Sequence, residues 1–179
     1  MFLDERGLLL SPLLRRTWSP CGQRPVLVQR TRHHQKVSVI AALALSQRRR
    51  RVRLCFRLHP GLSVESSRVT AFLRQLARQI RGPVIVIWDR LQAHRSRLVR
   101  AFATRWRRFH FEEFPPYAPE LNPVEYGWCW LKTNPLANHA PEDALELARL
   151  ARHHAGCLQH RPSLLWSFID HSPLPLRHK

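Results

Sequence analysis

The chain has 179 residues, a length typical of a single domain with a core of its own. Hydrophobic residues make up 44% of it, which excludes the intrinsically disordered class. No apolar run reaches the roughly 18 residues that a membrane-spanning helix requires, so we expect no membrane partner. The formal net charge of +18 predicts a polyanionic partner, and nucleic acid is the first candidate.

Arginine supplies most of this positive charge. Of the 30 basic residues, 27 are arginine, whose planar guanidinium suits phosphates and guanine edges. A GC-rich genome explains the ratio of arginine to lysine about equally well. It does not explain why the chain has only 12 acids, so the net charge still predicts an anionic partner.

Cysteine usage and the N-terminal sequence bear on the cellular compartment. Cys21, Cys55, Cys129 and Cys157 occur singly, without the C-x-x-C pairs of zinc or redox sites. We expect them to be reduced packing residues. The N-terminal sequence MFLDERG is acidic where a signal peptide is basic, which predicts a cytoplasmic protein.

The first third of the chain predicts three strands. Residues 2–10 are apolar on both sides of Asp4 and predict a strand that begins almost at the initiator methionine. Residues 37–45 and 52–58 predict a hairpin, and the second run alternates as a strand with one buried face does. The turn between them includes four arginines, residues 48–51, most simply a solvated tip; contact with DNA is the alternative.

The middle of the chain changes periodicity. Over residues 63–80 the apolar side chains recur at intervals of three and four, which predicts an amphipathic helix capped by Gly82. Residues 84–88 form a short apolar run and predict a central strand covered on both faces. A helix over residues 96–107 and a strand over 109–114 are predicted next.

The last third is predicted to be helical. One helix begins at Val124 and must end before Pro135, another begins at Pro141, and residues 163–171 add a short last one. Five strands interleaved with helices predict an α/β protein, in which a mixed five-stranded sheet carries helices on both faces.

Two acids lie in apolar surroundings. Asp4 lies within a predicted strand, and Asp89 directly follows another. A carboxylate in such a place is costly unless it is exposed at a cleft, hydrogen-bonded or bound to a metal. If the two strands are neighbours, a hard cation such as Mg²⁺ would relieve the repulsion between the carboxylates. A strand-end aspartate that only caps a loop is the alternative for either residue.

Glu125 has two interpretations. Asn122 and Pro123 predict the start of a helix, which makes Glu125 its third helical residue and able to close a capping box. A glutamate in the first turn can also face the strand ends, and Trp128 and Lys132 lie on the same side at helical spacing. The two roles do not exclude each other.

His94 lies five residues after Asp89 and is a candidate for phosphate contact or proton transfer. A lone histidine in a loop more often has no special role. Trp128 and Trp130 are more simply interpreted as packing residues than as base-stacking ones.

Three segments carry a family resemblance. FLDERG, VIVIWDRLQAHRS and FPPYAPELNPVEYGWCWLK resemble the three acidic blocks of DDE transposases of the mariner-like superfamily, in its bacterial insertion-sequence branch. The third block is the most specific, because PPYAPELNPVE reproduces the family pattern throughout. The 35 residues between Asp89 and Glu125 fit the spacing of such enzymes.

The resemblance implies a ribonuclease-H-like fold on which Asp4, Asp89 and Glu125 are the catalytic, metal-binding triad. It implies two Mg²⁺ ions, which Mn²⁺ can replace, and phosphoryl transfer in which one ion activates water or a DNA 3′-hydroxyl and the other stabilises the leaving oxygen. Glu120 is then a loop residue and not the catalytic acid.

The resemblance also implies partners. These are transposon ends and target DNA, in a homodimer or larger complex at the bacterial nucleoid. Arg90 stands where the family usually has asparagine, and phosphate contact is expected there; His94, Arg95 and Lys132 are the other expected DNA contacts.

Relatives carry a helix-turn-helix region that reads the transposon ends, and none precedes Asp4 here. Residues 1–179 are therefore expected to be a single catalytic domain, with residues 137–179 as a C-terminal helical extension. The chain is expected to be either the second frame of a split gene, completed by an upstream helix-turn-helix partner, or a truncated remnant.

Three functions compete. The first is an active transposase catalytic domain that cleaves and transfers DNA strands with metal ions. The second is a truncated, inactive, basic DNA-binding remnant, and the third, an RNA-processing nuclease of the same fold, is disfavoured by the NPVE block. Retention of all three acids favours the first.

Overall fold

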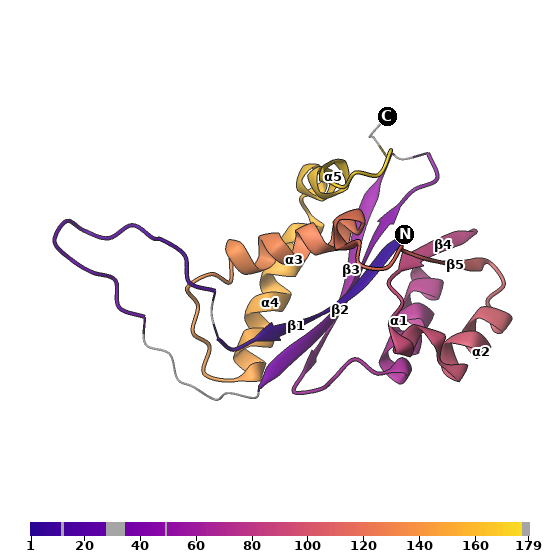
Figure 1. Cartoon of the computed structure of the whole chain (residues 1–179), viewed down its shortest axis with the longest axis horizontal. Helices are drawn as coiled ribbons and strands as arrows, with labels where there is room; N and C mark the ends of the chain where they lie inside the picture. The colour runs from indigo at the N-terminus through magenta and orange to yellow at the C-terminus, as the bar shows by residue number, and fades with distance from the viewer. Residues whose placement is uncertain (12, 28–34, 49, 177–179) are drawn as a thin grey trace.

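The computed structural model describes residues 1–11, 13–27, 35–48 and 50–176 (Figure 1). Its five strands form one sheet in the order β3-β2-β1-β4-β5. The hairpin strands and β1 pair antiparallel, whereas β1, β4 and β5 run parallel to one another. The strands are β1 (Phe2–Leu9), β2 (Lys36–Leu45), β3 (Val52–Pro60), β4 (Val84–Trp88) and β5 (Phe109–Glu113).

Helices cover both faces of the sheet, which confirms the predicted fold class. Figure 1 shows α1 and α2 on one side, and α3, α4 and α5 on the other. None of the described helices is long and apolar enough to span a membrane. The helices are α1 (Ser66–Gln79), α2 (Arg97–Arg105), α3 (Pro123–Thr133), α4 (Ala144–Gln159) and α5 (Pro162–His171), with short 3₁₀ turns η1 (Gln92–Arg95) and η2 (Pro119–Leu121).

The sheet separates two apolar cores, because successive side chains of a strand point to opposite faces. In β1, Phe2 packs in the core beneath α3, α4 and α5, and its neighbour Leu3 packs in the core beneath α1 and α2. In β3, Leu54 likewise packs in the first core and its neighbour Cys55 in the second. Helices α4 and α5 contribute Leu147, Leu158, Leu165 and other side chains to the first core.

Several details differ from the sequence prediction. Helix α1 is capped by Ile80 in an extended conformation, and Gly82 adopts its positive φ two residues later. Helix α4 begins at Ala144 and not at Pro141, because the Asp143 side chain accepts a hydrogen bond from the Glu146 backbone N–H and forms the N-cap. Strand β4 is fully covered on one face only, since on the other face Ile85 is 54% exposed and Ile87 is partly buried.

Candidate active site

The site is built at the junction of β1 and β4. Phe2 of β1 pairs with Ile87 of β4 in parallel register, and two residues further along each chain bring Asp4 beside Asp89. The carboxyl ends of parallel strands are where α/β sheets commonly form their sites. The predicted neighbourhood of Asp4 and Asp89 therefore follows from this strand pairing.

Helix α3 is attached to β1 at the same place. The Asn122 side chain accepts a hydrogen bond from the Val124 backbone N–H at 3.2 Å, and it donates to the Leu3 carbonyl at 3.3 Å. Trp128, in the second turn of α3, donates its indole N–H to Asp4 Oδ2 at 2.6 Å. These contacts orient the first turn of α3 toward Asp4 and hold the Asp4 carboxyl in one position.

Glu125 is not closing a capping box in this structure. The backbone N–H of the N-cap residue Asn122 donates to the Pro119 carbonyl, which leaves the Glu125 side chain free of that role. The Glu125 carboxylate instead pairs with Arg6 of β1 at 3.4 Å. Because Arg6 lies two residues after Asp4 and on the same face of β1, this ion pair keeps Glu125 over the face that carries Asp4.

The three carboxylates border one pocket. Asp4, Asp89 and Glu125 line it together with Arg90 and with the loop of residues 114–119. Asp4 is 7% exposed, whereas the other two acids are partly exposed. One buried and two accessible carboxylates thus converge from β1, the end of β4 and α3.

The electrostatics of Asp4 are unusual for an aspartate. Burial is the main cause that raises its pKa to about 8, and repulsion from Glu125, Glu5 and Asp89 adds to it. The hydrogen bond from Trp128 acts in the opposite direction. In the protein without a cation, Asp4 is therefore protonated at neutral pH.

A second cluster lies beside the pocket and holds Asp89. The side chain of His94 is 1% exposed and contacts Glu5 Oε1 through Nε2 at 2.9 Å and Asp89 Oδ1 through Nδ1 at 3.1 Å. Its ring stacks on Trp88, with ring centroids 4.0 Å apart. This arrangement fixes the His94 ring from both edges and one face.

The charges in this cluster are complementary. Burial opposes protonation of His94, but hydrogen bonds to Asp89 and Glu5 outweigh it and raise its pKa to about 10. Burial likewise opposes ionisation of Asp89, but hydrogen bonds from His94 and from the Leu91 backbone N–H hold its pKa below the usual range. The ligand atoms of Glu5, Asp89 and His94 lie within 4.8 Å of one another, a spacing that a metal ion also favours. We interpret the cluster as an ion pair, because a protonated imidazole has no lone pair to offer a metal.

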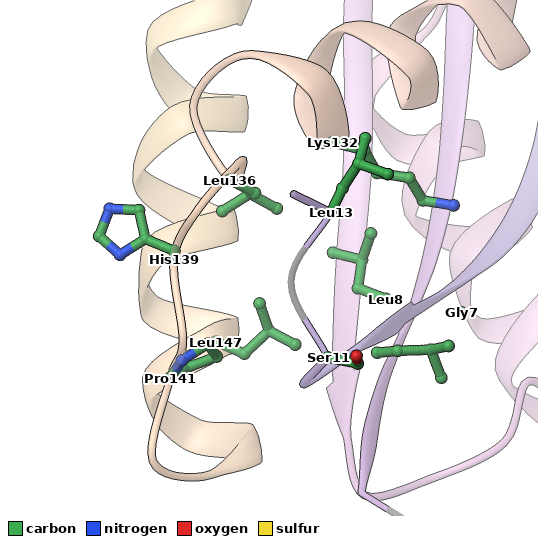
Figure 2. A pocket seen from close by; sticks show the side chains of 10 residues that line it. Gly7, Leu8, Ser11, Leu13, Lys132, Leu136, His139, Pro141 and Leu147 are labelled. Atoms are coloured by element: carbon green, nitrogen blue, oxygen red, sulfur yellow. The ribbon is translucent and has the colours of Figure 1, made fainter. Parts of the chain in front are cut away.

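The four residues expected to contact DNA have different surroundings. Arg90 lines the pocket, and both Arg90 and Arg95 pair with Glu113 of β5. His94 is buried, with both ring nitrogens bonded within the protein. Lys132 borders a separate pocket beneath the end of α3 (Figure 2), where burial and nearby Arg6 lower its pKa.

The sequence alone gives no indication of the role of Glu5 or of the ion pairs of Glu113. Glu5 follows Asp4 directly, and its side chain points to the opposite face of the sheet, where His94 lies. Glu113 is the last residue of β5 and holds the two arginines after β4. The alternation of side chains along β1 could have placed Glu5 on the face opposite Asp4, but only the fold shows that His94 is its partner. Trp128 was interpreted as packing, and it also bonds to Asp4.

Removal of the His94 side chain is expected to destabilise the protein. The substitution His94→Ala leaves Glu5 buried without its partner, and an unsatisfied buried group costs about 1–3 kcal/mol, more when charged. Chemical denaturation at neutral pH measures the loss. His110→Ala, an exposed histidine of β5, is the matched control and should change little. Equal stability of the two variants would show that the Glu5–His94 contact does not support the fold.

Comparisons with known proteins agree with this architecture. A family model of the DDE superfamily endonucleases matches residues 1–148. The crystal structure of the Mos1 mariner paired end complex with Mn is similar, with a TM-score of 0.68 and 19% identity over 96% of this chain and 52% of that one. The Mos1 paired-end complex with left transposon end has a TM-score of 0.60 and 17% identity, over 99% of this chain and 56% of that one. The catalytic domain of Mos1 mariner transposase has a TM-score of 0.55 and 14% identity, over 97% of this chain and 82% of that one.

This similarity confirms the ribonuclease-H-like fold. The chain spans about half the length of the paired-end transposase chains that it matches. No curated protein sequence matches it significantly. Because the family model covers most of the chain, from the strand that carries Asp4 through the helix that carries Glu125, the chain belongs to the DDE superfamily endonucleases.

Proposed function

We propose that this chain is the catalytic domain of a transposase, and that Asp4, Asp89 and Glu125 hold the divalent metal ions with which it cleaves DNA strands and joins them to a target. One observation carries the proposal. Three carboxylates from separate elements border one pocket, and their mutual repulsion contributes to the raised pKa of Asp4. Membership of the endonuclease family gives the reaction class.

The donor set fits a hard cation. All three groups are carboxylates, the ligands that Mg²⁺ and Mn²⁺ prefer, and a cation would favour the ionised form of Asp4 that burial disfavours. Structures of Mos1 that share the fold contain Mn or Mg. We propose two ions at this site; bound there, they would supply charge neutralisation at the scissile phosphate and an activated attacking oxygen.

The protein's own residues position the three acids. Trp128 fixes Asp4, and His94 fixes Asp89 while staying out of the pocket. Arg6 neutralises Glu125, and its side chain is 45% exposed, so it is free to turn toward solvent when a cation takes its place. Arg90, held by Glu113 at the pocket's border, is suited to a DNA phosphate.

The finer assignments belong to the same proposal. The PPYAPELNPVE block supports the bacterial insertion-sequence branch of the mariner-like superfamily. Transposon ends and target DNA are the proposed partners, in a complex of two or more copies, and we assign recognition of the ends to a helix-turn-helix unit. The similar Mos1 structures are paired-end complexes, one of them with the left transposon end, which supports transposon ends as a partner.

The direct test is nicking of supercoiled plasmid DNA by the purified chain. Nicking should require Mg²⁺ or Mn²⁺, stop with EDTA and return when the metal is restored. Salt-sensitive DNA binding without any nicking, in the presence of transposon ends and a helix-turn-helix partner, would support the inactive remnant instead.

DNA binding should depend steeply on salt. Between Asp89 and Glu112 the chain has seven arginines and no acid, and three of them, Arg97, Arg100 and Arg105, lie exposed on α2 without an ion-pair partner among the described acids. A protein that contacts DNA phosphates releases counterions, so the logarithm of the affinity falls as the logarithm of the salt concentration rises. Each phosphate contact contributes about 0.9 to the steepness of this slope. Replacing the three by glutamine should therefore reduce the slope by about 2–3.

The control removes the same charge from the other side of the sheet. Glutamine at Arg149 and Arg152 of α4 and at Arg161, all exposed, changes the net charge equally. Fluorescence anisotropy with a short duplex, titrated at several salt concentrations, gives both slopes. If the α4 set lowers the slope as much as the α2 set, binding follows net charge alone and α2 is not a preferred DNA surface.

A further inference from the structure

Tyr117 is an exposed aromatic residue at the border of the active site. Its side chain is 101% exposed, and it lines the pocket of Asp4, Asp89 and Glu125. No hydrogen bond or ring contact joins it to the described residues. Tyr117 has no role in the proposed reaction.

The conformation of Tyr117 is also costly. Its φ is +58°, in the left-handed region that L-residues other than glycine and asparagine rarely adopt. Because the ring is fully exposed to water, it contributes no hydrophobic stabilisation to the folded protein. Strained, exposed residues of this kind cluster at functional sites, so the feature calls for a binding partner that the free protein lacks.

The loop restrains the backbone at Tyr117. Prolines 115 and 116 precede Tyr117 and Pro119 follows, and each fixes its own backbone φ. Before the prolines, Phe114 donates its backbone N–H to the Trp88 carbonyl at 2.9 Å and stacks on Phe2. After them, the short η2 turn leads directly into α3. The backbone that carries the ring is thus preorganised beside the acidic pocket.

We propose that Tyr117 is a stacking platform for a nucleobase of the DNA strand whose phosphate occupies the pocket. The inference rests on the proposed function. An aromatic ring stacks on any base, independent of sequence, which suits an enzyme that must act on varied target DNA. Because bases inside a duplex already stack on their neighbours, the base that meets Tyr117 is unstacked, either at a strand end or rotated out of the helix.

The surroundings favour a base over other partners. The face of the ring is uncharged and lies among apolar prolines, which suits a base, whereas the carboxylates with their metal ions and Arg90 suit a phosphate. A nucleotide carries a phosphate and a base side by side. Its phosphate fits the charged floor of the pocket, and its base fits the ring at the border.

The experiment uses the full chain and a duplex with a short single-stranded 3′ end that carries 2-aminopurine beside the terminal phosphodiester. In Mg²⁺, stacking on Tyr117 should quench the fluorescence of the probe. Tyr117→Phe should keep the quenching. Tyr117→Leu and Tyr117→Ala should lose it and bind this end about 10- to 100-fold more weakly.

Two further variants separate stacking from structure. Tyr117→Asn tolerates the left-handed backbone, so it should lose quenching while the free energy of unfolding stays the same or rises. Trp18→Ala removes another fully exposed ring, from a residue that does not line the pocket, and should leave the quenching intact. Loss of quenching in Trp18→Ala but not in Tyr117→Ala would overturn the assignment.

The outcomes distinguish the two proposals. If the wild type nicks DNA but Tyr117→Ala and Tyr117→Leu quench and bind as it does, the stacking inference is wrong and the transposase function stands. If the wild type neither binds this end in Mg²⁺ nor nicks plasmid DNA, the proposed function fails and the stacking role fails with it.

Discussion

The substitution Asp89→Asn is expected to reduce metal-dependent DNA nicking by more than about 100-fold while the fold and salt-dependent DNA binding are kept. Loss of a group that only orients a metal ligand costs about 10- to 100-fold, and loss of a charged ligand should cost more. Asparagine keeps the shape of the side chain and an oxygen that accepts from His94 and from the Leu91 backbone N–H. Rates of plasmid nicking, far-ultraviolet circular dichroism and DNA titrations measure the three properties.

Glu125→Gln gives the parallel test for the third acid. Its carboxylate makes no capping-box bond here, so glutamine should leave the helix intact, at the loss of an exposed ion pair with Arg6. Nicking should fall as it does in Asp89→Asn. The matched control is Glu120→Gln, five residues earlier, which does not line the pocket. If Glu120→Gln stops nicking and Glu125→Gln does not, the third acid has been assigned wrongly.

Local signals in the sequence were sufficient for the elements that carry the site. The apolar run before Asp89 predicts β4, and Asn122 followed by Pro123 predicts the start of α3, because the capping chemistry involves residues next to each other. The five strands and their neighbouring helices were predicted for the same reason. Element boundaries moved by a few residues, as at Asp143, where a competing cap was available.

The pairing of groups across the sheet was not predictable in this way. Glu5 and His94 are 89 positions apart, and their contact depends on the parallel alignment of β1 with β4 and on the turn that returns His94 over Trp88. From the sequence alone, His94 is therefore predicted to be a loop histidine without a special role. Strand β4 looked covered on both faces because its sequence is apolar throughout, whereas α3 to α5 pack over β1, β2 and β3 and leave Ile85 exposed.

Removal of the Asp4 charge is expected to stabilise the metal-free protein. The pKa of Asp4 is about 8 in the folded state against 3.8 for an ordinary aspartate, so folding becomes less favourable as pH rises from about 4 to about 8, while the unfolded chain releases its proton. Asp4→Asn lacks this penalty. Its free energy of unfolding in EDTA should exceed that of the wild type by up to on the order of 5 kcal/mol at pH 8, and the difference should vanish near pH 4. Chemical denaturation across this range measures it.

Metal should reverse the order of stability of the wild type and Asp4→Asn. A cation binds the ionised form of Asp4 and displaces its proton, so Mg²⁺ or Mn²⁺ should stabilise the wild type increasingly as pH rises toward 8, and should stabilise Asp4→Asn far less. Asp170→Asn, an exposed acid of α5, should behave as the wild type does with and without metal. A metal-free Asp4→Asn protein that is less stable than the wild type at pH 8 would show that the ionised Asp4 carboxylate supports the fold by itself. In that case the repulsion among Asp4, Asp89 and Glu125 would no longer argue for a bound cation.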